Sequence, residues 1–329
     1  MNRWWILGWA VMLGVSVAAC DGGDDGDEDA GPDDGEDSGM MMMGEDAGPE
    51  MGPAVGSGAM LDALDPADYA CRGSVMAPAD DGADVSFTAV AEVFGSDPTA
   101  FAEGLTVQFY PGNVPASDCT GDCQEVTTDS SGEADVTDAA ESWYAYRIVG
   151  GEGLVSGAPQ DFITTLQVNE QAPAAAGESV TLTAVPESLR NTIITLLGVT
   201  QEEGTATITG TVVDCAGDSI ANATVRVFAD GSEVDLGGPG TRNGPREFYF
   251  NGEQFPRGAQ EATHVDGLYG AANVPVPASG EVRVEIWGSL TEGGAAEMLG
   301  CETVPVAEDG ISIVNVGPTR SDGPADCSG

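Results

Sequence analysis

The side chains of this 329-residue chain that could carry covalent chemistry are seven cysteines and one histidine. Cysteine thiolates act as nucleophiles, accept lipid groups, bind metals or close disulfides, and histidine acts as an acid or base near neutral pH. His264 stands alone, and the sequence has no H-E-x-x-H and no G-x-S-x-G segment. The sequence therefore argues against a zinc hydrolase and against a serine nucleophile, and the cysteines carry the main chemical information.

Cys20 follows an N-terminal segment that is typical of export. The chain begins Met-Asn-Arg and continues with an apolar run from Trp4 to Val17. A positive start, a short apolar stretch and small residues before a cut site indicate a secretory signal peptide over 1–19, because the run is too short to span a membrane comfortably.

The four residues Val17-Ala18-Ala19-Cys20 resemble the lipobox of bacterial lipoproteins. The resemblance implies cleavage before Cys20, a diacylglyceryl group on its thiol, and acylation of the new amine, for example with palmitate. Two or three acyl chains hold a protein stably on a membrane. We therefore expect a lipid-anchored protein of the cell envelope, at the outer membrane or cell surface rather than at the inner membrane.

Residues 20–58 have a composition of their own. They are mostly Asp, Glu, Gly, Pro, Ala and Met, and they include no aromatic residue. Such a segment cannot bury enough apolar surface to fold, so we expect a disordered acidic linker. Its acidic runs lack the ligand spacing of an EF-hand, and we expect no metal and no cofactor.

The charge of the chain limits its partners. The formal net charge is −45, and all ten basic residues are Arg. A field of this sign repels nucleic acid phosphates and anionic lipid headgroups. We therefore expect no nucleic-acid partner, and membrane contact only through the N-terminal lipid.

Residues 59–200 show the alternation of half-buried strands. Val85, Phe87 and Ala89 alternate with smaller or polar residues, similar runs follow, and turn signals separate them. Short strands with such punctuation predict a β-sandwich. After Pro186 the spacing changes and predicts a short helix that ends at Gly198, which we interpret as a lid or a spacer. Its expected apolar face consists of Leu189, Ile193, Leu196 and Leu197.

Residues 201–329 read as a second sandwich. Gly210, Val212 and Asp214 form a G-x-V-x-D pattern, and Asp266-Gly267 can supply the positive φ of a tight hairpin. These features, with Tyr269 and an N-V-P turn, resemble the carboxypeptidase regulatory-like domain, a transthyretin-like β-sandwich, over 205–318. The resemblance implies a folding or adhesion module and no peptidase activity. The predicted fold class is all-β: two Ig/transthyretin-like sandwiches and one short helix after the linker.

About thirty residues between Ser232 and Ala262 depart from that family. They concentrate Arg and aromatic side chains, which is the chemistry of protein, carboxylate or sugar recognition. The alternative is that the aromatic rings pack on the sandwich and the Arg side chains neutralise nearby acids. The candidate contact residues are Arg242, Arg246, Phe248, Tyr249, Phe255 and Arg257.

Six cysteines remain after Cys20, and export to an oxidising compartment predicts three disulfides. Cys119 and Cys123 flank a short Gly-bearing loop and form the most economical local pair. We expect Cys215 to pair with Cys301, which leaves Cys71 and Cys327 to cross between the modules.

The sequence as a whole favours a non-enzymatic lipoprotein that acts as a structural or protein-binding β-sandwich module, with an envelope protein as partner. The alternatives are a carbohydrate-binding surface lipoprotein with a glycan as partner, and an enzyme with an unrecognised acidic site. No pair of carboxylates stands out among the 55 acidic residues to mark such a site.

Overall fold

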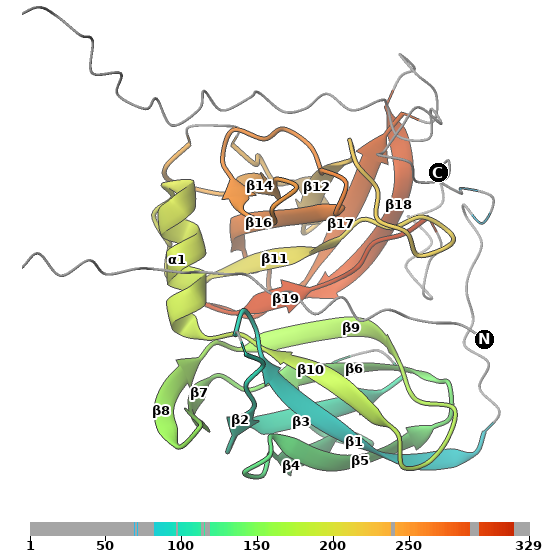
Figure 1. Ribbon diagram of the computed structural model, residues 1–329. Helices are drawn as coiled ribbons and strands as arrows, with labels where there is room; N and C mark the ends of the chain where they lie inside the picture. Colours follow the sequence, from blue (N-terminus) through green and yellow to red (C-terminus); the bar gives the residue numbers. More distant parts are fainter. Residues whose placement is uncertain are drawn as a thin grey trace, which may run out of the picture.

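The computed structural model describes Tyr69, Cys71 and residues 82–96, 98–112, 115, 119–237, 241–289 and 296–318. The signal peptide, the acidic linker, Cys20 and Cys327 lie outside the described residues. Within the described residues the chain forms strands and one helix, arranged as two stacked sandwiches (Figure 1). The predicted all-β class with one short helix is therefore confirmed.

The first sandwich has a three-stranded layer in which β1 lies between β10 and β5. β1 pairs in parallel with β10 and antiparallel with β5. The alternating residues of β1 point inward, and Phe87 packs against Phe109 of the facing layer with ring centroids 5.6 Å apart. The strands of this layer are β1 (Asp84–Val93), β5 (Glu133–Ala139) and β10 (Ser179–Ala184).

The facing layer belongs to a sheet that continues into the second sandwich. Its order is β15-β14-β16-β11-β19-β9-β6-β3-β4. The first-module strands are β3 (Thr106–Pro111), β4 (Gln124–Thr127), β6 (Trp143–Ile148) and β9 (Thr165–Gln171). The second-module strands are β11 (Thr205–Thr211), β14 (Arg246–Phe250), β15 (Pro256–Arg257), β16 (Leu268–Pro275) and β19 (Ile311–Ile313).

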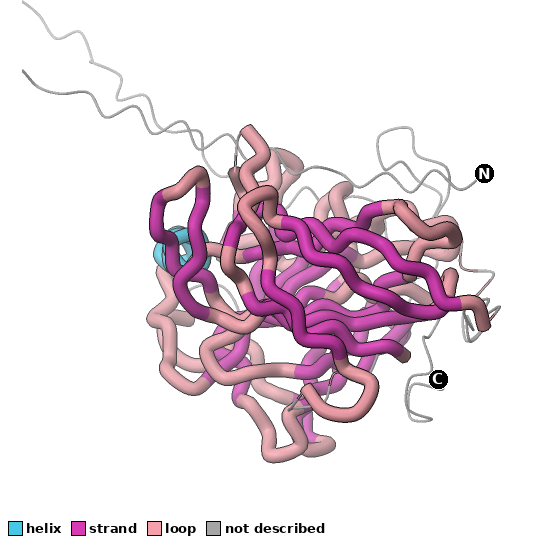
Figure 2. The backbone as a smooth tube through the Cα atoms, turned by 90° about the horizontal axis from the view of Figure 1, so that it is seen from below, coloured by secondary structure: helices cyan, strands magenta, loops and turns pink. Residues whose placement is uncertain are grey.

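Two smaller sheets complete the architecture. One covers the second-module half of the long sheet, in the order β13-β12-β17-β18, and the other has the order β2-β7-β8. The first consists of β12 (Thr224–Ala229), β13 (Ser232–Glu233), β17 (Glu281–Gly288) and β18 (Glu297–Pro305). The second consists of β2 (Ala102–Glu103), β7 (Gly151–Val155) and β8 (Ala158–Phe162). Figure 2 shows the strands of the layers from below.

Strand β19, the last strand among the described residues, joins the two modules. It lies between β9 and β11 and pairs in parallel with both, so that Ile311 stands opposite Thr165 on one side and Thr207 on the other. The sequence ranges 59–200 and 201–329 remain predictions for the module limits, because the last strand of the second range also extends the sheet of the first.

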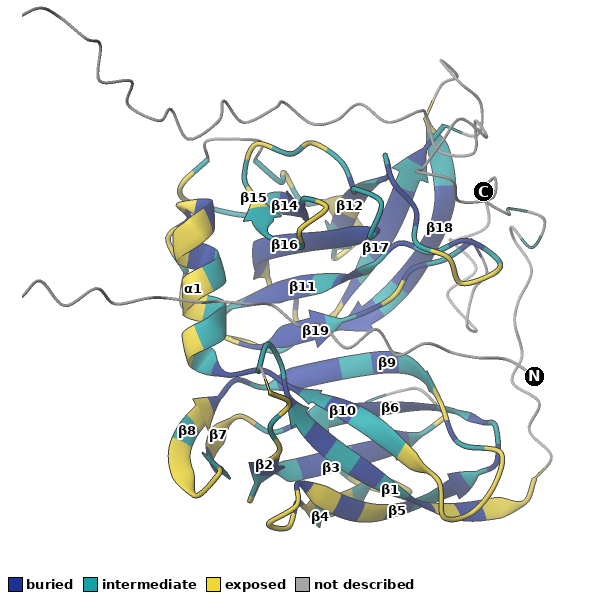
Figure 3. Ribbon diagram, in the orientation of Figure 1, coloured by how far each residue is buried: buried dark blue, intermediate teal, exposed yellow. Residues whose placement is uncertain are grey.

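The long sheet is buried on both faces near its centre. Phe109 and Tyr146 join the core of the first sandwich. Their neighbours Tyr110 and Ala145 point the other way and join the core that the second sandwich builds. Figure 3 shows this burial along β6, β11 and β16, whereas the outer strands β4 and β5 carry exposed positions. Since successive side chains alternate between faces, one strand serves two cores.

Helix α1 (Glu187–Leu197) begins after Pro186 and ends at Gly198, which adopts the left-handed conformation, as predicted. It packs on the outer face of β14 and β16, where Ile194 and Leu197 meet Phe248. The predicted apolar face is wrong at Leu196, which is 57% exposed. The helix turns Ile194 rather than Leu196 toward the sheet, since residues three apart share a face.

Two glycines of the second module mark close approaches. A Cβ on Gly210 would lie 1.7 Å from the carbonyl oxygen of Val314, so the G-x-V-x-D glycine lets β11 approach the segment after β19. Gly267 has φ of +69° and closes a turn with His264, as the Asp266-Gly267 pair predicted. The predicted tight hairpin is wrong, because β15 before the turn and β16 after it both pair with β14 and not with each other.

Candidate functional site

The predicted contact segment does not form an exposed surface. Arg246 is 3% exposed, and its guanidinium donates to three main-chain carbonyls. They belong to Leu197 at 2.8 Å, Thr241 at 2.8 Å and Gly258 at 2.9 Å. Leu197 is the last residue of α1, where carbonyls lack helical donors and a positive charge is favourable. Burial lowers the pKa of Arg246 from its ordinary value, and this side chain therefore has a structural role.

The aromatic residues of the same strand are buried as well. Phe248 packs against α1, and its ring lies over Gly270, where a Cβ would come within 2.1 Å of it. Tyr249 faces the opposite core, donates through its hydroxyl to Glu247 Oε2 at 2.9 Å, and accepts from the Val225 amide at 3.0 Å. The interpretation of Arg246, Phe248 and Tyr249 as contact residues is wrong, because β14 is covered on one face by the helix and on the other by the sandwich.

The remaining candidates have a different environment. Phe255 is half-buried, and Arg242 and Arg257 are exposed. The alternative that the aromatic rings pack on the sandwich is correct for Phe248 and Tyr249. The second half of that alternative, neutralisation of acids, does not describe Arg246, whose guanidinium donates to main-chain carbonyls.

Arg and aromatic side chains do come together on another surface, the outer face of β12 and β17. We call the set Arg226, Phe228, Arg283, Glu285 and Trp287 the cationic–aromatic face. Cross-strand pairing places Phe228 opposite Arg283 and Arg226 opposite Glu285. The guanidinium carbon of Arg226 lies 4.1 Å from the Trp287 ring centroid, and that of Arg283 lies 4.3 Å from the Phe228 ring.

The buried carboxylate of Glu285 binds two other members of this face. Its carboxylate accepts from the Arg283 guanidinium at 2.8 Å and from the Trp287 indole nitrogen at 2.9 Å. The side chain of Glu285 is 7% exposed, whereas that of Arg283 is 25% exposed. The Arg226 side chain is 43% exposed and approaches Glu233 at 3.9 Å. Arg226 is therefore the member of the face that is most available to a partner.

Sequence reasoning missed this face, although its signal was present. The segments 224–229 and 281–288 alternate between apolar and polar or aromatic residues. With a period of two, Arg226 and Phe228 must share one side of a strand, and so must Arg283, Glu285 and Trp287. The register between the two strands was not predictable, and register decides which Arg meets which ring.

A groove lies beside the face, between β12 and β14. It has a volume of about 490 Å³, and its apolar walls include Val225, Val234 and Leu236. Glu233, Asp235 and Glu247 line it as well, and Arg226 of the cationic–aromatic face borders it. We call it the acidic groove, since three of its four charged lining residues are acids. Burial raises the pKa of Glu247, the hydrogen bond from Tyr249 opposes this, and the charge of Glu261 adds to it.

His264 begins the turn that Gly267 closes, and its carbonyl accepts from the Gly267 amide at 2.8 Å. Its ring lies against Gly252, where a Cβ would come within 2.7 Å of it. Burial raises the pKa of the neighbouring Asp266. Across the described residues, no group of three or more His, Cys, Asp or Glu side chains could hold a metal ion.

A second buried polar cluster lies in the first sandwich. Tyr146 donates to Gln167 Oε1 at 2.6 Å and accepts from the Thr183 amide at 2.7 Å, and Gln167 donates to Glu170. Burial raises the pKa of Glu170. The cluster connects β6, β9 and β10 across the core, so we assign it to the stability of the fold.

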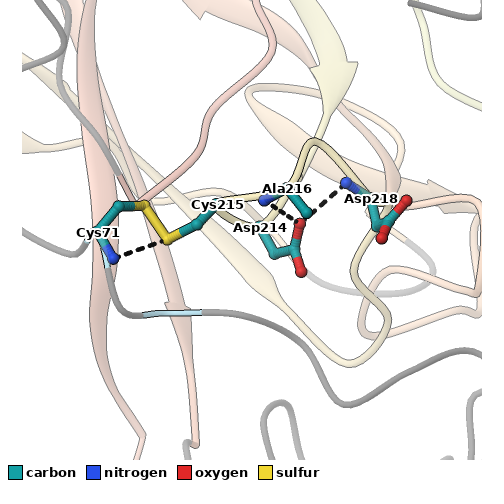
Figure 4. Close-up of a disulfide and its surroundings, with 5 residues drawn as sticks. All are labelled: Cys71, Asp214, Cys215, Ala216 and Asp218. Atoms are coloured by element: carbon teal, nitrogen blue, oxygen red, sulfur yellow. Dashed lines mark hydrogen bonds between the residues drawn. A yellow bond between two sulfur atoms is a disulfide. The ribbon is translucent and has the colours of Figure 1, made fainter. Parts of the chain in front are cut away.

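Two disulfides have both of their cysteines within the described residues. Cys119 and Cys123 form the expected local pair. Cys215 bonds to Cys71 rather than to Cys301, and the predicted pairings Cys215–Cys301 and Cys71–Cys327 are both wrong (Figure 4). No local pattern indicates that Cys71, before the first sandwich, bonds to the second. Cys301 is also disulfide-bonded.

No family model and no curated protein matches the chain. Among solved structures, it is similar to the Bacillus anthracis TIE protein at 14% identity and a TM-score of 0.20, over 71% of this chain and 34% of that one. It is similar to the Streptococcal ancillary pilin at 14% identity and a TM-score of 0.20, over 73% and 63%. For the minor pilin of Streptococcus agalactiae the identity is 12% and the TM-score 0.23, over 73% and 98%.

The chain spans about a third of the length of the TIE protein and less than two thirds of that of the ancillary pilin. Within the described residues, no helix is both long enough and apolar enough to cross a membrane.

Proposed function

We propose that this chain is a cell-envelope lipoprotein that is anchored through Cys20 and acts as a non-enzymatic, protein-binding β-sandwich module. The lipobox-like segment 17–20 and the apolar run before it support the anchor. The acidic linker 20–58 then serves as a tether. The positive φ of Gly267 and the close approach at Gly210 support a carboxypeptidase regulatory-like second module.

The cationic–aromatic face is the proposed contact surface, and its exposed Arg226 is the observation that carries this assignment. Arg and Trp dominate the energetics of protein interfaces when they are buried by a partner. A chain with a net charge of −45 repels most acidic surfaces, so a local positive group selects where an acidic partner can dock.

The geometry favours a protein partner over a sugar. Sugar recognition of this kind needs an open aromatic face, but the Arg226 guanidinium already stacks on the ring of Trp287. The guanidinium retains free donor positions for a carboxylate, and such charge-assisted bonds are directional.

The contact surface can be tested with one charge reversal and a matched control. Envelope extract is passed over three immobilised proteins, each made without the N-terminal lipid: the wild type, the Arg226→Glu variant and the Arg257→Glu variant. The wild type and Arg257→Glu, which reverses an exposed Arg on β15, should retain the same protein at low salt, and Arg226→Glu should lose it. Equal retention by all three would reject the face, and glycan binding that depends on Trp287 would favour the sugar-binding alternative.

The anchor is tested separately. Intact mass of the membrane-extracted protein should show loss of 1–19 and added acyl mass on Cys20, and the Cys20→Ser variant should leave the membrane fraction. An unmodified Cys20 thiol at the processed end would reject the anchor and leave the contact surface untouched.

The acidic groove favours a second candidate, an enzyme that uses Glu247 as a general acid. A carboxyl group with a raised pKa in a groove is what such chemistry needs. Any hydrolase activity of the purified chain that Glu247→Gln abolishes, while binding through Arg226 persists, would establish this candidate in place of the first.

A further inference from the structure

The Cys71–Cys215 disulfide connects the start of the folded part of the chain to its second module. Tyr69 already packs against the core of the second sandwich. Two residues later, Cys71 bonds to Cys215 with 5.7 Å between their Cα atoms, across a sequence separation of 144. The whole first sandwich lies inside the covalent loop that this bond closes.

Cys215 is held in a well-supported turn after β11. The Asp214 carboxylate accepts from the amides of Ala216 and Asp218, both at 2.9 Å, as Figure 4 shows. The Asp214 amide donates to the Asp218 carbonyl at 2.9 Å, and the Val213 amide donates to Val316 at 3.1 Å. The turn therefore fixes Cys215 to the second sandwich, in which β11 is bonded to β16 and β19.

Two covalent paths lead from Cys71 to Cys215. The short path is the disulfide, which spans 5.7 Å between Cα atoms, and the long path is the intervening chain with a sequence separation of 144. Extended, that chain would reach about 500 Å, at ~3.5 Å per residue. When two such paths act in parallel, the short one is taut while the long one is slack, so tension reaches the second module without loading the first.

We propose that the Cys71–Cys215 disulfide passes tension on the N-terminal tether directly into the chain that follows Cys215, so that the backbone between the two cysteines, which includes the first sandwich and β11, carries none of it. The first sandwich then stays folded, while the second sandwich, which holds the cationic–aromatic face on β12 and β17, carries the load. The source of tension in the cell rests on the proposed anchor at Cys20, but the mechanical property itself does not.

The test is single-molecule stretching of the full mature chain, held at its two ends by peptide tags so that no cysteine is added. Under constant force, dithiothreitol is then supplied. One of its thiolates attacks a sulfur of the bond, the S–S bond breaks and the other cysteine leaves as a thiolate. The second dithiothreitol thiol then closes its ring and releases the first cysteine. Both cysteines are half-exposed, so the reagent can reach them.

We expect cleavage to free the segment between Cys71 and Cys215, with a gain in contour length of about 500 Å once the first sandwich unfolds. The rate at which dithiothreitol cleaves the Cys71–Cys215 bond should rise with the applied force, because force speeds the cleavage only of a bond that is under tension. A cleavage rate that does not depend on force would overturn the proposal.

Two variants sharpen the result. Cys71→Ser with Cys215→Ser should release the additional ~500 Å without reductant. Cys119→Ser with Cys123→Ser removes a bond that closes a loop of sequence separation 4 inside the first sandwich, and should stretch like the wild type before reduction. Equal total length for the wild type and the Cys71/Cys215 variant without reductant would also contradict the proposal. An unlipidated Cys20 would reject the anchor but leave these lengths unchanged.

Discussion

Two strands of the second sandwich carry the same kinds of residue and use them in opposite ways. β14 places Arg246 and Phe248 under α1, where both are buried. β12 places Arg226 and Phe228 on the outer face of a sheet, where Arg226 is 43% exposed and stacks on Trp287. The difference arises from what covers each strand, because a charged group without a cover remains solvated and one under a helix needs fixed acceptors. Composition alone therefore does not identify a contact surface.

The largest effect is expected for Arg246→Ala. It leaves the carbonyls of Leu197, Thr241 and Gly258 without their donor, and we expect a loss of about 5 kcal/mol of unfolding free energy, since each unsatisfied buried group costs ~1–3 kcal/mol. Arg226→Ala is the matched control and should cost at most about 1 kcal/mol. Urea denaturation measures both, and equal losses would remove the contrast between the strands.

Phe248→Ala should follow with a loss of about 3–4 kcal/mol, because it opens a cavity between α1 and the sheet. Phe228→Ala, on the half-buried outer position, should lose clearly less. The same denaturation measurement applies, and a larger loss at Phe228 would show that the outer face is the better packed of the two.

Gly270→Ala tests how tightly the helix side is packed. The new methyl group would meet the Phe248 ring within 2.1 Å, and we expect a loss of about 2 kcal/mol from overpacking. Combining it with Phe248→Ala should remove most of that cost, since the clashing ring is gone. Additive losses in the double variant would show that the clash lies elsewhere.

The smallest effect concerns pH. Burial raises the folded-state pKa of Glu247 above its ordinary value of 4.5. The ionised group therefore destabilises the fold at neutral pH, and its contribution improves as the pH falls through the raised pKa toward 4.5. Glu247→Gln should gain less stability on acidification than the wild type, and the exposed Glu253→Gln serves as control. Identical pH profiles for Glu247→Gln and the wild type would contradict the shift.

Much of the architecture could be predicted from the sequence, and specific residues show where prediction ended. The period of two gave the strands, and Pro186 and Gly198 gave the helix ends. Long-range pairing was not predictable, because nothing local in β19 indicates that it lies between β9 and β11. The same holds for Cys71, whose partner is set by where the tertiary fold returns the chain. The prediction of contact residues was wrong for those on β14, because the burial of that strand depends on the position of α1.

If β14 is structural and the β12–β17 face makes contacts, Arg246 must be inaccessible and Arg226 accessible in the folded protein. Arginine-specific modification with phenylglyoxal, followed by peptide mass spectrometry, measures this directly at both positions in one sample. Arg226 should react early and Arg246 should stay unmodified until the protein is unfolded. Modification of Arg246 in the folded protein at the rate of Arg226 would contradict the assignment of β14 to structure and of the β12–β17 face to contact.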